Sequence, residues 1–207
     1  MRLILASASP RRAELLRSAG YTFDVVVADV DESIHQGESP SNYVRRLAAE
    51  KSAAARILVV SGFSRTNDGP PESGHYRNAD SIILGADTTV VVDDEILGKP
   101  RDDEEGRQML RRLSGKTHQV LTGISLRQGA YEVGRVETTT VTFRPLTDED
   151  ISWYVASGEG RDKAGGYAIQ GLASRFIPSI AGSYANVVGL PVACLDELLR
   201  SLLASGR

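Results

Sequence analysis

The sequence predicts an α/β fold, in which strands and helices alternate along the chain. Residues 3–6 form an apolar run that breaks into a loop of small residues and then a helical pattern, which indicates a strand, a loop and a helix. A long amphipathic helical pattern at 40–58 and a continuous apolar run at 81–86 repeat this alternation. A length of 207 residues accommodates one α/β domain or two closely joined lobes.

Composition and charge narrow the class of protein. Hydrophobic residues make up 41% and charged residues 25% of the chain, which is usual for a soluble protein. A net charge of −3 argues against general nucleic-acid binding, which would need a basic surface. The single cysteine, Cys194, excludes an intrachain disulfide and a thiolate metal cluster. No apolar run approaches membrane-spanning length and the start is too short for a signal-peptide core, so we expect a cytoplasmic enzyme without nucleic-acid or membrane partners.

The first helix carries an unusual charge pattern. Ser9 suits the N-cap, Pro10 the first helical position and Gly20 the helix end. Arg11 and Arg12 lie in the first turn, where the helix dipole already supplies about half a positive charge. An anion would compensate, because free N–H groups, hydroxyls and two guanidinium groups together make a phosphate or carboxylate site. The alternative is two solvated surface arginines.

The second helix, expected from Pro40 to about residue 58, brings a lysine into its apolar stripe. The stripe residues recur at helical spacing and are Val44, Leu47, Ala48, Ala55 and Leu58. Lys51 shares this stripe, so its ammonium group must extend to water, form an ion pair or face a polar site. Arg45, Arg46 and Glu50 are placed to face water.

The other elements follow from apolar periodicity and turn residues. Strands are expected at 22–27, 81–86, 90–92, 96–97, 118–126, 136–143 and 176–180. Helices are expected at 102–113, from a capping box at Thr147 to about residue 158, and from Pro191 onward. The stretch 61–80 is rich in Gly, Ser, Pro, Asn and charged residues, which indicates a flexible surface insertion and not a domain boundary.

Two acidic residues are candidates for metal binding or general base catalysis. Asp87 follows the apolar run at 81–86, and a carboxylate there is costly to desolvate unless it meets a cation or hydrogen-bond donors. Ligands of open α/β sheets gather at the carboxyl ends of strands. Glu32, at the end of an acidic loop, would supply a second oxygen to the same ion, and Mg²⁺ prefers such ligands beside phosphates. The alternatives are that Asp87 caps a turn through Thr88 or Thr89, and that Glu32 is simply solvated.

Four cations complement these acids. Lys99 lies in the turn Gly98-Lys99-Pro100, which fixes the direction of its ammonium group. Together with Arg11, Arg12 and Lys51, it suits a metal–triphosphate complex.

One phosphate-binding pattern is rejected. Ser114-Gly115-Lys116-Thr117 looks like the end of a P-loop. That motif needs a glycine at position 110, where this chain has leucine, and a strand where a helix is expected.

Short motifs run in order over nearly the whole chain, apart from 61–80. They are Leu5-Ala6-Ser7-Ala8-Ser9-Pro10-Arg11-Arg12, Asp31-Glu32, Ala48-Ala49-Glu50-Lys51, Gly85-Ala86-Asp87-Thr88, Gly98-Lys99-Pro100, Ser114-Gly115-Lys116-Thr117-His118, Asp162-Lys163-Ala164-Gly165-Gly166-Tyr167-Ala168-Ile169-Gln170-Gly171 and Asn186-Val187-Val188-Gly189-Leu190-Pro191. This ordered series resembles the Maf family of nucleoside triphosphate pyrophosphatases. Each motif alone is unspecific, whereas the series is highly specific.

The resemblance implies a fold, a reaction and a set of site residues. The fold is a single domain of two lobes over residues 1–207, with a mixed β-sheet flanked by helices and a central cleft, as in inosine triphosphatases. The reaction is Mg²⁺- or Mn²⁺-dependent hydrolysis of a nucleoside triphosphate to the monophosphate and pyrophosphate, by a homodimer. The implied roles are proton acceptor for Asp87, metal binding for Glu32 and Asp87, phosphate binding for Ser9, Arg12, Lys51 and Lys99, and selection of dTTP and UTP for Arg11, Thr88 and Gln170.

Three alternative functions compete with this one. A 7-methyl-GTP pyrophosphatase is the second candidate within the family, and the motif at 162–171 disfavours it. A nucleotide-binding regulator of septum formation and cell division comes from another class, and it would bind nucleotide without needing Asp87 to activate water. An RNA-binding module would show steep salt dependence, and the acidic pI of 5.7 and 6% aromatic content disfavour it.

Overall fold

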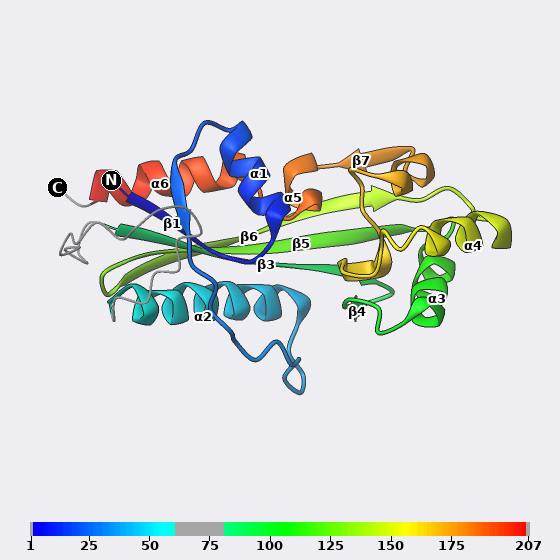
Figure 1. Ribbon diagram of the computed structural model, residues 1–207, viewed down its shortest axis with the longest axis horizontal. Helices are drawn as coiled ribbons and strands as arrows, with labels where there is room; N and C mark the ends of the chain where they lie inside the picture. Colours follow the sequence, from blue (N-terminus) through cyan, green and yellow to red (C-terminus); the bar gives the residue numbers. More distant parts are fainter. Residues whose placement is uncertain (1, 61–80, 206–207) are drawn as a thin grey trace. The chain divides into compact units, whose positions relative to one another are not determined.

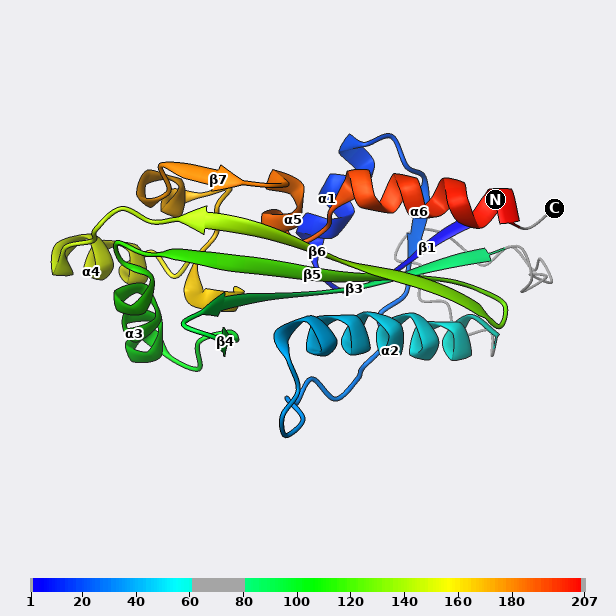
Figure 2. The same cartoon turned by 180° about the vertical axis from the view of Figure 1, so that it is seen from behind.

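The computed structural model describes residues 2–60 and 81–205, so the insertion expected at 61–80 lies outside the described residues. Within them, seven strands form one mixed sheet flanked by helices, in the order β2-β1-β3-β5-β6-β7, with β4 paired to β3 (Figures 1 and 2). The strands are β1 (Arg2–Ala6), β2 (Phe23–Val25), β3 (Ser81–Val92), β4 (Glu95–Leu97), β5 (Thr117–Gln128), β6 (Tyr131–Thr142) and β7 (Ser179–Ala181). The helices are α1 (Pro10–Ser18), α2 (Pro40–Val60), α3 (Asp103–Leu113), α4 (Asp148–Ala156), α5 (Tyr184–Val188) and α6 (Val192–Ser205), with 3₁₀ turns η2 (Ala164–Gly166) and η3 (Leu172–Phe176). The predicted α/β class is confirmed.

Strand pairing places Asp87 beyond the end of a neighbouring strand. β1 runs parallel to β2 and to β3, and its last pair with β3 joins Ala6 to Gly85. β3 continues past this point and later pairs antiparallel with β4. Asp87 therefore lies two residues beyond the carboxyl end of β1, at the edge of the parallel group where ligands of α/β sheets gather.

The chain forms two compact units that share three strands. Unit 1 comprises residues 1–87, 123–136 and 192–207, and unit 2 comprises residues 88–122 and 137–191. β3, β5 and β6 each contribute residues to both units.

Helices cover both faces of the sheet in unit 1. α2 lies on one face, and α1 and α6 lie on the other (Figures 1 and 2). Two glycines let α2 approach closely: a Cβ on Gly85 would lie 2.1 Å from the Ala48 carbonyl oxygen, and one on Gly123 would lie 2.3 Å from the Val44 carbonyl oxygen. Ala55 of α2 shares one buried apolar cluster with Ile4, Ala6, Val26 and Ile83.

Unit 2 has an aromatic core beneath helices with well-formed caps. Phe143 and Phe176 are at most 2% exposed and pack with Tyr154 and Tyr167. The predicted capping box is present, since the Thr147 hydroxyl accepts the Asp150 N–H and the Asp150 carboxylate accepts the Thr147 N–H. Ser114 caps the end of α3 and leads into β5, so the rejection of a P-loop there is confirmed.

The structure corrects several expected elements. β3 runs unbroken from Ser81 to Val92, whereas a strand ending before Asp87 and a separate hairpin strand were expected, because the β-branched residues after Asp87 continue the strand. The strand expected at 176–180 is β7, which begins after Pro178, since proline has no N–H for a ladder hydrogen bond. The strand expected at 22–27 is only Phe23–Val25, and α5 was not predicted.

Candidate active site

The first turn of α1 presents one arginine to the interior of unit 1. Ser9 occupies the N-cap as expected, but its hydroxyl does not cap the helix, and its backbone N–H donates to Ser7 Oγ at 3.2 Å. Arg12 is 9% exposed, and its Nη1 donates to the same Ser7 oxygen at 3.0 Å. Burial lowers the pKa of Arg12, while the charges of Asp87 and Glu32 oppose that shift. Arg12 is therefore not a solvated surface arginine, whereas Arg11 is partly exposed.

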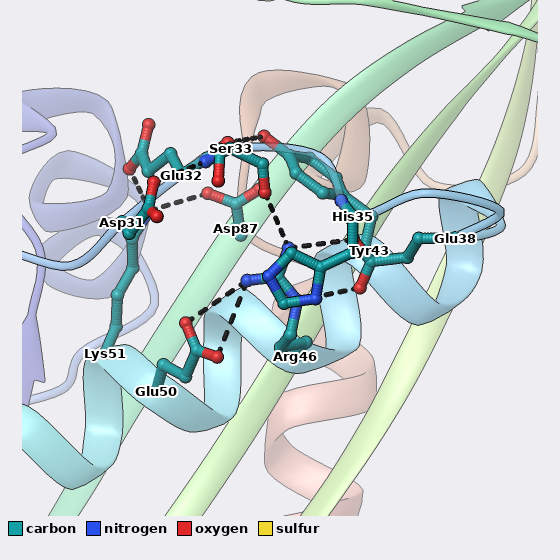
Figure 3. A network of polar contacts seen from close by, with 10 residues as sticks. All are labelled: Asp31, Glu32, Ser33, His35, Glu38, Tyr43, Arg46, Glu50, Lys51 and Asp87. Carbon is teal, nitrogen blue, oxygen red and sulfur yellow. Dashed lines mark hydrogen bonds and ion pairs between the residues drawn. The ribbon is translucent and has the colours of Figure 1, made fainter.

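A lysine joins the two acidic candidates. Lys51 Nζ lies 2.6 Å from Glu32 Oε1 and 2.6 Å from Asp87 Oδ1 (Figure 3). The Lys51 and Asp87 side chains are 12% and 10% exposed, and Glu32 is half exposed at 49%. The inward direction predicted for Lys51 is thus confirmed, and its ammonium group forms ion pairs and does not extend to water.

Desolvation and opposite charges compete at Asp87. Burial raises the pKa of the Asp87 carboxyl above its ordinary value, and the charges of Lys51 and Arg12 act in the opposite direction. A buried carboxylate is retained when cations compensate its desolvation, and both cations come from the elements that meet here, α2 and α1. The turn-capping alternative fails, because Asp87 lies within β3.

The fold explains why these groups meet. α2 rests directly on the backbone of β3 at Gly85, two residues before Asp87. Lys51 lies within the same α2 turn as Ala48 and Ser52, the residues in closest contact with Gly85. The close packing that glycine permits therefore sets the distance between the ammonium group and the carboxylate.

The carboxylates fit a hard divalent cation shared with a substrate. Among the described residues, no three His, Cys, Asp or Glu side chains group to hold a metal ion. Glu32 and Asp87 nevertheless converge on one cationic atom, Lys51 Nζ. Mg²⁺ is commonly held by one or two carboxylates together with substrate phosphates and water, so this pair suits it.

Unit 2 carries the remaining predicted residues. Thr88 is partly exposed, and its hydroxyl lies 3.0 Å from Thr122 Oγ1 and donates to the Gly189 carbonyl at 3.3 Å. Lys99 and Gln170 are exposed. The structure thus brings together Glu32, Lys51 and Asp87 near Arg12, and a shared site with the unit 2 residues stays a prediction.

Sequence reasoning missed three residues that support this group. Ser7 accepts the hydrogen bond from Arg12, and the Tyr43 hydroxyl donates to the Glu32 carbonyl at 3.0 Å. Arg46 was expected to face water, but its side chain is only 18% exposed because the loop before α2 folds against it. No periodic pattern marks these contacts, since each joins a side chain to a loop.

The fold and this group of charges define an α/β protein in which two carboxylates meet a lysine beyond the carboxyl end of a parallel strand. Residues 2–202 match the family described as Maf-like protein, and the chain belongs to the Maf family.

The chain is similar to several named relatives over almost its full length. It is 49% identical to the dTTP/UTP pyrophosphatase of Symbiobacterium thermophilum, covering 95% of this chain and 92% of the relative. It is 47% identical to the protein of the same name from Escherichia coli O157:H7 (98% and 93%) and 44% identical to that from Vibrio parahaemolyticus (97% and 97%). Among solved structures, the Ham1 protein of Staphylococcus aureus matches with a TM-score of 0.41 and 13% identity, covering 69% of this chain and 72% of that protein.

Proposed function

We propose that this protein is a nucleoside triphosphate pyrophosphatase that hydrolyses dTTP and UTP to the nucleoside monophosphate and pyrophosphate. The observation that carries the proposal is the meeting of two carboxylates and a lysine, Glu32, Asp87 and Lys51, near the buried Arg12. The relatives named dTTP/UTP pyrophosphatase, 44–49% identical over at least 95% of this chain, support the same activity.

In this reaction, Asp87 is the proton acceptor for the attacking water. The water oxygen bonds to the α-phosphorus, and the bond from that phosphorus to the oxygen bridging to the β-phosphorus breaks. Pyrophosphate leaves with the electron pair of that bond, and Asp87 takes the water proton. Because Asp87 is 7% exposed, solvent screens its charge only weakly.

The cations of the site bind the triphosphate. Ser9, Arg12, Lys51 and Lys99 contact phosphate oxygens in this proposal, with Arg12 offering its planar guanidinium group and the lysines point charges. Glu32 and Asp87 hold a divalent cation, Mg²⁺ or Mn²⁺, which when bound offsets the triphosphate charge and polarises the phosphoryl oxygens. Lys51 exchanges a carboxylate partner for a phosphate oxygen when the substrate arrives.

Selection of the base falls to Arg11, Thr88 and Gln170. The Gln170 amide offers both a donor and an acceptor, as a uracil or thymine edge requires. The Thr88 hydroxyl is oriented by its contacts with Thr122 and with the Gly189 carbonyl.

The cellular setting follows from the same proposal. A homodimer in the cytoplasm would remove dTTP, UTP or modified pyrimidine nucleotides without a nucleic-acid or membrane partner. Across residues 2–60 and 81–205, no helix has the length and apolarity needed to cross a membrane. Neither a 7-methyl-GTP pyrophosphatase nor a regulator of septum formation is favoured, because the three relatives described above are named for dTTP and UTP.

A substrate panel tests the proposal. Pyrophosphate release is measured from canonical and modified nucleoside triphosphates in Mg²⁺, in Mn²⁺ and in EDTA, with folding checked by circular dichroism. We expect metal-dependent release that is fastest with dTTP and UTP. A preference for a purine nucleotide would overturn the roles of Arg11, Thr88 and Gln170, and absence of release from every nucleotide by folded protein would overturn the activity itself.

A further inference from the structure

An arginine of α2 fastens the loop that carries Glu32. Arg46 Nε donates to Glu38 Oε1 at 2.7 Å and Nη2 donates to Glu38 Oε2 at 2.8 Å, which is a two-pronged pairing of guanidinium and carboxylate (Figure 3). Nη2 also donates to the Ser33 carbonyl at 2.9 Å, and Nη1 lies 3.3 Å from Glu50 Oε2 on the next turn of α2. One guanidinium group therefore contacts both ends of the segment 33–38.

The loop's own hydrogen bonds extend this fastening. Glu38 Oε2 accepts the His35 N–H at 3.1 Å, and the Glu38 N–H donates to the His35 carbonyl at 3.0 Å. Asp31 Oδ1 accepts the Ser33 N–H at 2.9 Å. Because the Glu38 carboxylate accepts from Arg46 and from the His35 N–H, Arg46 also holds the His35 amide in place. The segment 31–38 is therefore attached to α2 through a connected set of hydrogen bonds.

Glu32 lies directly beside the fastened residue. Its neighbour Ser33 is held by Arg46, and its own carbonyl accepts the Tyr43 hydroxyl at 3.0 Å. The Glu32 side chain is half exposed, and its carboxylate pairs with Lys51 Nζ at 2.6 Å. Tyr43 and Arg46 thus hold two successive backbone carbonyls, those of Glu32 and Ser33, on α2, the helix that also carries Lys51.

The pKa values of Glu38 and Arg46 both reflect the hydrogen bonds between them. The hydrogen bonds from Arg46 lower the pKa of Glu38 to about 2, and those with Glu38 raise the pKa of Arg46. The Arg46 and Glu38 side chains are 18% and 9% exposed, so the pair is mostly shielded from solvent.

We propose that Arg46 is a positioning residue: by holding Ser33 and Glu38 on α2, it places Glu32 where its carboxylate faces Lys51 and Asp87. This inference rests on the proposed function, in which Glu32 and Asp87 hold the divalent cation. Arg46 acts through the loop and does not touch the substrate.

Three variants separate this role from a general effect on folding. Arg46→Met removes the guanidinium group, Arg46→Lys keeps the charge but loses the two-pronged geometry, and Arg45→Met is the matched control because Arg45 is the exposed neighbour on the same helix. For each, we would measure hydrogen exchange of the amides in 31–38 without nucleotide or metal. We would also measure the Mg²⁺ concentration for half-maximal pyrophosphate release, and kcat and KM for dTTP at saturating Mg²⁺.

We expect faster exchange at His35 and its neighbours in Arg46→Met, with α2 still protected. The Mg²⁺ requirement should rise by about 10- to 100-fold, as is usual when a residue that orients a metal ligand is lost. KM for dTTP at saturating Mg²⁺ should stay near the wild-type value in Arg46→Met. The exchange rates and the Mg²⁺ requirement of Arg46→Lys should lie between those of the wild type and Arg46→Met. Arg45→Met should match the wild type in every measurement.

Each contrary outcome is distinct. Unchanged exchange over 31–38 in Arg46→Met overturns the fastening itself. Faster exchange with an unchanged Mg²⁺ requirement overturns the link to Glu32. If the wild-type protein releases no pyrophosphate, the proposed function and the metal-linked role fail together, while the exchange measurement still decides whether Arg46 holds the loop.

Discussion

Replacing Gly85 by alanine should separate α2 from β3 and disable the site. The added Cβ would lie 2.1 Å from the Ala48 carbonyl oxygen and 2.7 Å from the Ser52 nitrogen. These two atoms are hydrogen-bonding partners in the i→i−4 pattern of the helix, and backbone atoms cannot rotate away as a side chain can. An ordinary contact needs at least 3.4 Å, so the helix must move by about 1 Å or more.

The size of the effect follows from that displacement. Overpacking of this kind costs about 1–3 kcal/mol of unfolding free energy, and backbone partners favour the upper end. A shift of about 1 Å also displaces the backbone of Lys51, whose Nζ now lies 2.6 Å from Asp87 Oδ1. Misplacement on that scale lowers kcat/KM by about 100-fold.

Urea denaturation and pyrophosphate release measure the two consequences. Gly106→Ala is the matched control, because a Cβ there would meet neighbours only at 3.9 Å and Gly106 lies inside α3. Alanine is favoured over glycine in a helix, so the control should gain up to about 1 kcal/mol. Wild-type stability and activity in Gly85→Ala would refute the packing argument.

Two further predictions concern the surroundings of the site. Arg46 lowers the pKa of Glu38 from its ordinary 4.5 to about 2. The ion pair of Glu38 with Arg46 therefore stabilises the folded protein fully above pH 4.5, and this contribution is lost as the pH falls through 2. Thermal unfolding should therefore show Glu38→Gln below the wild type at neutral pH, with the two converging in acid; a constant gap would contradict this. Thr122→Val should lower the preference for dTTP over dCTP by about fivefold, the value of one hydrogen bond to Thr88, whereas Thr122→Ser should keep it. Equal kcat/KM ratios in all three proteins would rule out that orienting role.

The site residues that could be predicted from the sequence are those that break a simple rule. Lys51 stands on an apolar stripe and Asp87 follows a buried run, so the sequence alone indicates that each needs a partner. The structure pairs them at 2.6 Å. Arg12, a cation in the first helical turn, is likewise buried near these charges, whereas a common site with Lys99 and Gln170 stays a prediction.

The remaining features depend on contacts that periodicity does not encode. Asp87 is an unfavourable strand residue, and it remains within β3 because Lys51 from a distant helix compensates its charge and β-branched residues follow it. Arg46 lies on the side of α2 that its period assigns to water, and the loop at 31–38 folds over it. The fold of such a loop is set by side-chain hydrogen bonds to its backbone, which leave no regular pattern in the sequence.

Comparing Asp87→Asn with the wild-type protein on dTTP and Mg²⁺ tests whether Asp87 is the proton acceptor. The amide preserves the size of the side chain and cannot accept the water proton. The assay quantifies dTMP and pyrophosphate by chromatography, and calorimetry measures dTTP binding by the same samples. We expect equal amounts of both products from the wild type, and no turnover with retained nucleotide binding in the variant. Near wild-type hydrolysis by Asp87→Asn would contradict the assignment of Asp87 as the proton acceptor.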